Sequence, residues 1–215
     1  MRENTKKTLE RAVLIPVLRA GSMQAGHALV DAMMAGGVTV VEVTMTVPNA
    51  LTLLRELKQR HGDKLLLGSG TVTDAAQAEA TIEEGAEFVV SPSLHLDVIA
   101  KTRELGRISI PGALTPTEVI TAWRAGADYV KIFPCSAMGG ASYLKSLLAP
   151  FPELRLIPTG GVTLQTAADF LKAGALALGV GTDLVNTAAI AEGKPEIVTN
   201  AARAYLEVIR AARSQ

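Results

Sequence analysis

Cysteine is almost absent from this chain, since Cys135 is the only one among 215 residues. A single cysteine cannot form a disulfide within the chain or supply a cysteine-rich metal site. The three histidines, His27, His61 and His95, have no spacing typical of a zinc site. We therefore expect neither a cysteine-rich metal site nor a histidine zinc site.

An excess of charge of one sign is also missing, because 21 lysines and arginines balance 21 aspartates and glutamates. Nothing in the charge pattern favours nucleic acid or an anionic membrane as a partner. The longest apolar stretches, such as Ala12 to Leu18, are far shorter than the roughly 20 residues of a spanning helix. The polar N-terminal segment lacks the apolar core of a signal peptide. These absences predict a cytoplasmic protein.

A repeated pattern runs along the chain: a helical stretch ends at glycine, and a β-branched run follows. In the four clear copies, the helical stretch ends at Gly37, Gly85, Gly126 and Gly174. Glycine ends a helix through a left-handed cap, and the apolar run after it is typical of a buried parallel strand. Four fainter copies fill the gaps, so the pattern predicts eight strands.

The expected strand ends are separated by roughly 20 to 30 residues, the size of one strand-and-helix unit. They fall near Arg19, Thr44, Thr71, Pro92, Gly112, Phe133, Thr159 and Gly181. Eight such units predict an α/β fold, a (β/α)8 TIM barrel, as one catalytic domain over residues 1–215. An extra N-terminal helix, Asn4 to Ala12, is expected to plug the N-terminal mouth, with its cap at Asn4 or Thr5.

An open doubly wound sheet is the alternative fold. Gly68-Ser69-Gly70 begins like a dinucleotide-binding motif, but Thr73 occupies the place of its third glycine. This departure favours the barrel.

Lys131 lies in an apolar run, Asp128 to Pro134, where an ammonium group is unfavourable. It must be paired or lose its proton, and an unprotonated lysine is a nucleophile. Alternation along the strand turns Tyr129, Lys131 and Phe133 toward the barrel interior. A lysine that extends to the strand end, or a structural ion pair, is the alternative interpretation.

Glu42 is likewise an isolated charge in an apolar run, but a negative one. It is flanked by valines near the end of the second expected strand. The active sites of (β/α)8 barrels lie at the C-terminal ends of the strands, so Glu42 and Lys131 should face one cavity. A carboxylate beside an amine nucleophile can move protons for it. We predict a catalytic pair.

Arg19 and two glycine clusters mark other strand ends. The guanidinium of Arg19 could hold a carboxylate through two hydrogen bonds, or form a salt bridge at the rim. Thr159-Gly160-Gly161 and Gly179 to Thr182 follow the last two strands, where backbone N–H groups can approach a phosphate. If these glycines are not merely structural, they predict a phosphorylated small-molecule substrate.

A series of ordered motifs over nearly the whole chain resembles the 2-keto-3-deoxy-6-phosphogluconate (KDPG) aldolases, which overlap with the 4-hydroxy-2-oxoglutarate (KHG) aldolases. The motifs are Gly36-Gly37 leading into Glu42-Val43-Thr44, Gly68 to Val72, Ser91-Pro92, Pro111-Gly112, Lys131 to Pro134, Pro158 to Val162 and Gly179 to Gly181. The resemblance implies a class I, Schiff-base, metal-free lyase that needs no cofactor and cleaves KDPG to pyruvate and D-glyceraldehyde 3-phosphate. It implies KHG, cleaved to pyruvate and glyoxylate, as a further substrate. It also implies the Entner–Doudoroff pathway and a homotrimer.

The resemblance assigns roles by position. Lys131 is similar to the family's Schiff-base lysine and Glu42 to its general acid/base. The substrate-binding positions are Thr71 and Pro92 at the pyruvate end, Gly160, Gly161, Gly181 and Thr182 around the phosphate, and also Phe133. Thr159 resembles the threonine of gluconate-type enzymes, where a hydroxyl could read the configuration at C4.

One position departs from the family pattern. Members often carry an arginine four residues after the glutamate to hold the pyruvate carboxylate, but Thr46 stands there. Galactonate-type relatives instead have an arginine at the place of Arg19, to which we assign carboxylate binding. A 2-keto-3-deoxy-6-phosphogalactonate aldolase therefore stays an alternative. A metal-dependent pyruvate aldolase, a phosphosugar isomerase or epimerase and a non-catalytic sugar-phosphate-binding barrel are others.

Overall fold

A closed ring of parallel strands forms the centre of the computed structural model, which describes residues 2–213. The strands are β1 (Leu14–Leu18), β2 (Val40–Thr44), β3 (Leu66–Gly70), β4 (Phe88–Val90), β5 (Ile108–Ile110), β6 (Gly112–Ala113), β7 (Val130–Ile132), β8 (Leu156–Pro158) and β9 (Leu178–Val180). They form two ladders, in the orders β5-β4-β3-β2-β1-β9 and β6-β7-β8. A parallel bridge from Thr159 to Gly179 joins β8 to β9 and closes the ring.

Pro111 divides the fifth barrel strand into β5 and β6, a break that the sequence pattern did not predict. Proline has no N–H group to donate to a neighbouring strand, so a ladder is interrupted where it occurs. The carbonyl of Pro111 still accepts a 2.9 Å hydrogen bond from the N–H of Lys131. Counting β5 and β6 as one strand gives the eight strands of the predicted (β/α)8 barrel, which is confirmed.

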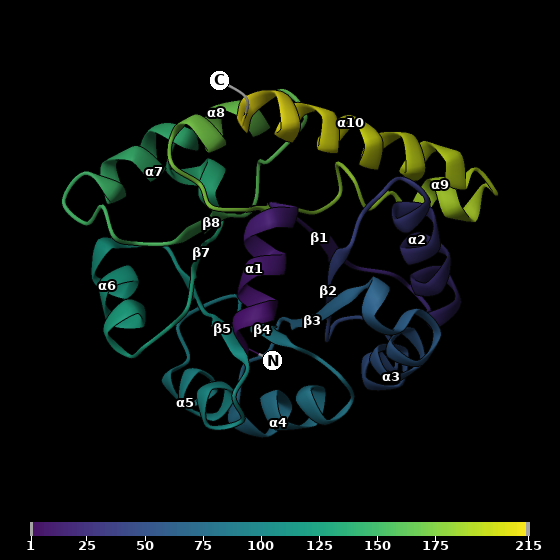
Figure 1. Cartoon of the computed structure of the whole chain (residues 1–215), viewed down its shortest axis with the longest axis horizontal. Helices are drawn as coiled ribbons and strands as arrows, with labels where there is room; N and C mark the ends of the chain where they lie inside the picture. Colours follow the sequence, from purple (N-terminus) through teal and green to yellow (C-terminus); the bar gives the residue numbers. More distant parts are fainter. Residues whose placement is uncertain (1, 214–215) are drawn as a thin grey trace.

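Helices surround the barrel (Figure 1). They are α1 (Arg2–Ala12), α2 (Met23–Ala35), α3 (Ala50–His61), α4 (Ala75–Glu83), α5 (Leu96–Glu104), α6 (Pro116–Arg124), α7 (Ala141–Leu148), α8 (Ala167–Lys172), α9 (Thr187–Ala191) and α10 (Pro195–Arg213), with short 3-10 turns at Gly62–Lys64 and Cys135–Met138. Within residues 2–213, no helix combines the length and apolarity needed to cross a membrane.

The N-terminal helix α1 covers one end of the ring, as predicted, and Figure 1 shows it in front of the strands. Its Leu9 is 1% exposed and packs among the inward residues at the beginnings of the strands, including Val40 and Phe88. Arg2 and Lys6 both pair with Asp128, at 2.7 and 2.9 Å. The expected cap at Asn4 or Thr5 is wrong, because the helix already includes Arg2.

Side chains alternate along the strands between the barrel interior and the helix layer. On β2, Val40 belongs to the interior cluster, whereas Val41 and Val43 pack against the helices. Each fully buried aliphatic side chain contributes about 1.5–3 kcal/mol to folding. This alternation leaves Glu42 on the inward face, beyond the apolar layer that Val40 shares with Leu9.

Candidate active site

Lys131 and Glu42 meet inside the barrel. They are 5% and 3% exposed, and Nζ of the lysine lies 3.6 Å from Oε1 of the glutamate. Oε1 of Glu42 has no hydrogen-bond partner within the described residues. Lys131 therefore does not extend to solvent at the strand end, which was one alternative interpretation of the sequence. It pairs with Glu42 in the barrel interior, where Oε1 of Glu42 can still accept a hydrogen bond.

Burial raises the pKa of the Glu42 carboxyl above its ordinary value of 4.5, and the nearby cations Lys131 and Arg19 offset only part of this effect. A carboxyl with a raised pKa can both hold and release a proton nearer to neutral pH. Nζ of Lys131 also lies 5.3 Å from the centre of the Phe133 ring. The pair thus combines a potential nucleophile with a group suited to proton transfer.

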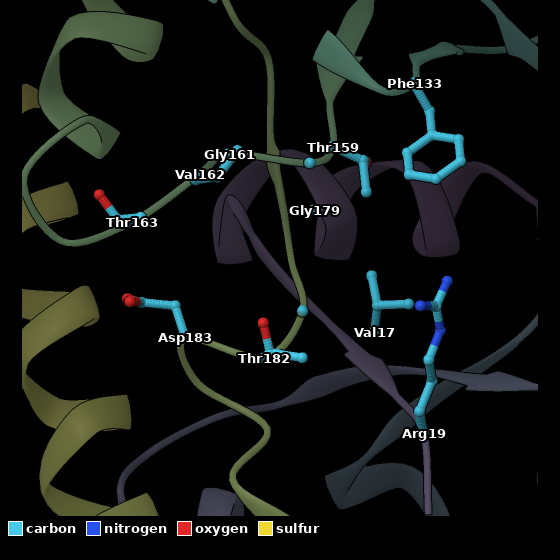
Figure 2. A pocket seen from close by; sticks show the side chains of 12 residues that line it. Val17, Arg19, Phe133, Thr159, Gly161, Val162, Thr163, Gly179, Thr182 and Asp183 are labelled. Carbon is cyan, nitrogen blue, oxygen red and sulfur yellow. The ribbon is translucent and has the colours of Figure 1, made fainter. Parts of the chain in front are cut away.

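A pocket of about 400 Å³ opens beside Phe133 at the C-terminal ends of the strands. Its lining consists of Val17, Arg19, Phe133, Thr159, Gly160, Gly161, Val162, Thr163, Gly179, Gly181, Thr182 and Asp183. Figure 2 shows Arg19 and Phe133 at one end, and Thr163 and Asp183 at the other. Phe133 connects the pocket to Lys131, two residues earlier in the chain.

Arg19 contributes the positive charge at its end of the pocket (Figure 2). Within residues 2–213, none of the ion pairs found at the rim involves its guanidinium, although its charge acts on Glu42. The rim salt bridge that the sequence left open is therefore absent from the described part of the chain. An exposed guanidinium without a partner can bind a carboxylate or phosphate.

The glycine clusters shape the other end of the pocket. Gly160 and Gly161 have φ values of 84° and 78°, a backbone conformation that favours glycine. Among the described residues, no acceptor is found for the backbone N–H groups of Gly161 and Thr182. Thr159 is 6% exposed, and a β-carbon added to Gly179 would lie 2.1 Å from its Oγ1. Free N–H groups of this kind can hold an anion.

Thr71 and Pro92 are not part of the pocket lining. Thr71 follows β3 directly and has a φ of 60°, a strained value for a β-branched residue. Pro92 follows β4, and its carbonyl carbon would lie 2.4 Å from a β-carbon added to Gly112. Both residues are at strand ends on the same side of the barrel as the pocket, but apart from its lining.

Several lining residues were not predicted from sequence: Val17, Val162, Thr163 and Asp183. Val17 could have been found, because it shares the inward face of β1 with Arg19. Asp183 had no such signal. Its Oδ2 accepts hydrogen bonds from Tyr205 Oη at 2.5 Å and from the N–H of Leu164 at 3.3 Å.

Two other groups bear on the chemistry. Within the described part of the chain, no cluster of three or more His, Cys, Asp or Glu side chains could hold a metal ion. Cys135 is fully buried, and burial raises its pKa to about 11. Its thiol is therefore protonated at neutral pH and unsuited to nucleophilic attack.

Comparison with known proteins extends these observations. A family model described as "KDPG and KHG aldolase" matches residues 5–201. The 2-dehydro-3-deoxy-6-phosphogalactonate aldolase of Escherichia coli strain K12 is 33% identical over 92% of this chain and 96% of its own length. The 2-dehydro-3-deoxy-phosphogluconate aldolase of Treponema pallidum is 32% identical over 94% of this chain and 96% of its own.

Among solved structures, the KDPG aldolase of Legionella pneumophila, with pyruvate captured as a covalent carbinolamine intermediate, superposes with a TM-score of 0.86. It is 27% identical and covers 94% of this chain and 97% of its own. The superposed structure, the family model and the relatives all match nearly the same part of this chain. The chain accordingly belongs to the KDPG and KHG aldolase family and is a class I carbon–carbon lyase.

Proposed function

We propose that this enzyme cleaves KDPG to pyruvate and D-glyceraldehyde 3-phosphate through a Schiff base on Lys131, with Glu42 as the proton-transfer group. The observation that carries the proposal is the buried pair of Lys131 and Glu42, 3.6 Å apart. The covalent carbinolamine formed by pyruvate in the Legionella relative supports the same chemistry.

The first step forms a bond between Nζ of Lys131 and C2 of the substrate. The unprotonated amine attacks the ketone, and Glu42 transfers protons so that the C2 oxygen leaves as water. The resulting protonated imine draws electrons from the neighbouring carbons.

The second step breaks the bond between C3 and C4. Glu42, acting through a water molecule, accepts the proton of the C4 hydroxyl, and the electrons of the broken bond move into the imine to form an enamine. Glyceraldehyde 3-phosphate leaves. Protonation at C3 and hydrolysis of the imine then release pyruvate and restore the free lysine.

Substrate binding divides between the two ends of the pocket. Arg19 binds the carboxylate at one end, beside Phe133. Thr71 and Pro92, at strand ends outside the lining of this pocket, contact the pyruvate part. Backbone N–H groups of Gly160, Gly161, Gly181 and Thr182 bind the phosphate, supported by the free N–H groups of two of them. The placement of Gly161 away from Arg19 in the pocket (Figure 2) agrees with a substrate that is anionic at both ends.

The choice among related substrates rests on Thr159, whose hydroxyl is held at the pocket wall beside Gly179. It could bind the C4 hydroxyl of the gluconate-type substrate. KHG, which gives pyruvate and glyoxylate, is the second substrate that we propose. Arg19 supports 2-keto-3-deoxy-6-phosphogalactonate as the alternative. Comparison of kcat/KM on the three compounds decides among them.

A homotrimer and a place in the Entner–Doudoroff pathway rest on resemblance to the family alone. Light scattering coupled to size-exclusion chromatography measures the assembly directly. A mass equal to one copy of the chain would contradict the trimer.

Trapping with borohydride tests the mechanism. Incubation with pyruvate and borohydride should reduce the imine to a stable adduct, and peptide mass analysis should locate it on Lys131. Lys131→Arg should abolish the adduct, whereas Lys145→Arg, on the outer helix α7, should not change it. Failure to form an adduct on Lys131 in the unaltered enzyme would contradict the proposal.

A further inference from the structure

Two threonine hydroxyls at the end of β2 form a chain that reaches β1. Thr44 Oγ1 donates to the carbonyl oxygen of Leu18 at 2.8 Å and lies 2.7 Å from Oγ1 of Thr46. A hydroxyl has one proton, and that of Thr44 is engaged with Leu18. Thr46 must therefore donate to Thr44. The chain has a single direction, from Thr46 through Thr44 to the Leu18 carbonyl.

The backbone around these hydroxyls is held on two sides. Thr44 is fully buried. The N–H of Val47 donates to the carbonyl of Thr44 at 3.1 Å and closes a turn around Thr46, while the N–H of Met45 donates to Gly70 on β3 at 2.8 Å. The turn is thus attached to both neighbouring strands, and Thr46 is kept at a fixed distance from β1.

The carbonyl that accepts this chain belongs to the peptide group joining Leu18 to Arg19. That carbonyl and the Arg19 N–H lie in one rigid plane, so fixing the carbonyl fixes the direction in which Arg19 continues. The guanidinium itself has no hydrogen-bonding partner among residues 2–213. A long side chain without a partner depends on its backbone for its position in the pocket.

We propose that Thr46 is a positioning residue for Arg19 and that it acts through Thr44 and the Leu18 carbonyl. The inference rests on the proposed function of Arg19, which is to bind the substrate carboxylate. Thr46 is exposed and belongs neither to the pocket lining nor to the core, so its hydroxyl has no evident part in folding.

Thr46→Val tests this role because it keeps the size of the side chain and removes the donor. A carboxylate contact is present both before and during the reaction, so its partial loss should raise KM and leave kcat little changed. We expect the pyruvate dissociation constant to rise about 3- to 10-fold, the range of one hydrogen bond. Thr46→Ser keeps the hydroxyl and should bind pyruvate like the unaltered enzyme. Competitive inhibition by inorganic phosphate, at the glycine end, should not change.

The same substitution in an Arg19→Ala background separates an action through Arg19 from every other effect. If Thr46 acts through Arg19, Thr46→Val has no further effect on pyruvate binding once the guanidinium is gone. An equal effect in both backgrounds overturns the inference, as does normal pyruvate binding by the single variant. Absence of a borohydride-trapped adduct on Lys131 in the unaltered enzyme would instead reject the proposed function itself.

Discussion

A β-carbon added to Gly70 would lie 2.0 Å from Oε1 of Glu42 and 2.6 Å from its Cδ. Two non-bonded atoms cannot approach so closely, so the glutamate carboxylate occupies space that only glycine leaves free. Gly70 is the last residue of β3, next to β2, which carries Glu42. The position of Glu42, the proposed proton-transfer group, thus depends on the absence of a side chain on the neighbouring strand.

Gly70→Ala should therefore displace the Glu42 carboxylate and lower kcat by roughly 100-fold or more, the range expected for loss of general acid–base catalysis. Steady-state assays of pyruvate release measure the effect. Gly21→Ala is the matched control, because no atom lies within 4 Å of a β-carbon at that position. Equal kcat values for Gly70→Ala and the unaltered enzyme would show that the carboxylate can move without loss of activity.

Glu42→Gln should reduce turnover by roughly 100-fold or more while pyruvate still forms a slow, trappable imine on Lys131. Because burial raises the pKa of Glu42, the acid limb of the kcat/KM profile should lie above pH 4.5 in the unaltered enzyme. That limb should disappear in the variant. A pH profile that keeps the same limb after the substitution would assign it to a different group.

The raised pKa of Glu42 also predicts a pH-dependent cost in stability. Since the folded state holds this proton more tightly than the unfolded state, the favourable contribution is complete below pH 4.5 and is lost as the pH rises through the folded-state pKa. The glutamine in Glu42→Gln does not titrate. The free energy of unfolding of this variant should therefore rise, relative to that of the unaltered enzyme, as the pH increases from 4.5 to neutral. Urea denaturation across this range measures the difference, and a difference independent of pH would contradict the assignment.

Thr71→Gly separates backbone strain from function. Relief of the strained φ of 60° is worth about 1–2 kcal/mol, which offsets the roughly 0.5–1 kcal/mol of extra chain entropy that glycine brings. We expect the free energy of unfolding to change by less than about 1 kcal/mol, and kcat/KM to fall if Thr71 contacts substrate as proposed. Val13 has a similar φ of 63°, but it is a buried valine that is only 2% exposed. Val13→Gly should therefore lower the free energy of unfolding by about 1.5–3 kcal/mol through lost apolar burial. Equal destabilisation of the two variants would argue against strain at Thr71.

Asp128→Asn should loosen the attachment of α1. Burial works to raise the pKa of Asp128, but hydrogen bonds from Arg2, from the N–H of Ser109 and from Lys6 outweigh it and lower the pKa below 3.8. The pairs therefore stabilise the fold above that pH, and this contribution is lost as the pH falls through the folded-state pKa. At pH 7 we expect a loss of about 1–3 kcal/mol in unfolding free energy.

The matched control for α1 attachment is Asp63→Asn. The carboxylate of Asp63 is fully exposed and lies 3.8 Å from Lys58, so its removal should leave the free energy of unfolding nearly unchanged. If Asp128→Asn and Asp63→Asn have the same effect at pH 7, the contacts of Arg2 and Lys6 do not secure the helix.

Much of the fold could be predicted because parallel strands buried on both faces appear as short apolar runs, and glycine ends the helices before them. α10 runs from Pro195 to Arg213, and the proline in its first turn is a start signal that the sequence carries. The first residues of α5 and α7 could not be predicted. The residues at their N-caps, His95 and Gly140, make no side-chain capping bond, so the local sequence carries no start signal.

The candidate site was predictable where a charge interrupts an apolar run, as at Lys131 and Glu42, because burial of an isolated charge requires a reason. Asp183 was missed because its position depends on Tyr205 in α10, which contacts it only once the chain has folded. Loop residues of this kind follow no periodic pattern. Thr46 was noticed only as the place of a missing arginine, since its hydrogen bond to Thr44 depends on the turn between them.

The helix α1 covers the beginnings of the strands, so substrate and products share the opening at the opposite ends, where the pocket lies. In the proposed mechanism, pyruvate is still bound covalently to Lys131 when the aldehyde forms. We expect the aldehyde to leave first and the keto acid second, so that in the synthetic direction pyruvate must load before the aldehyde can be used.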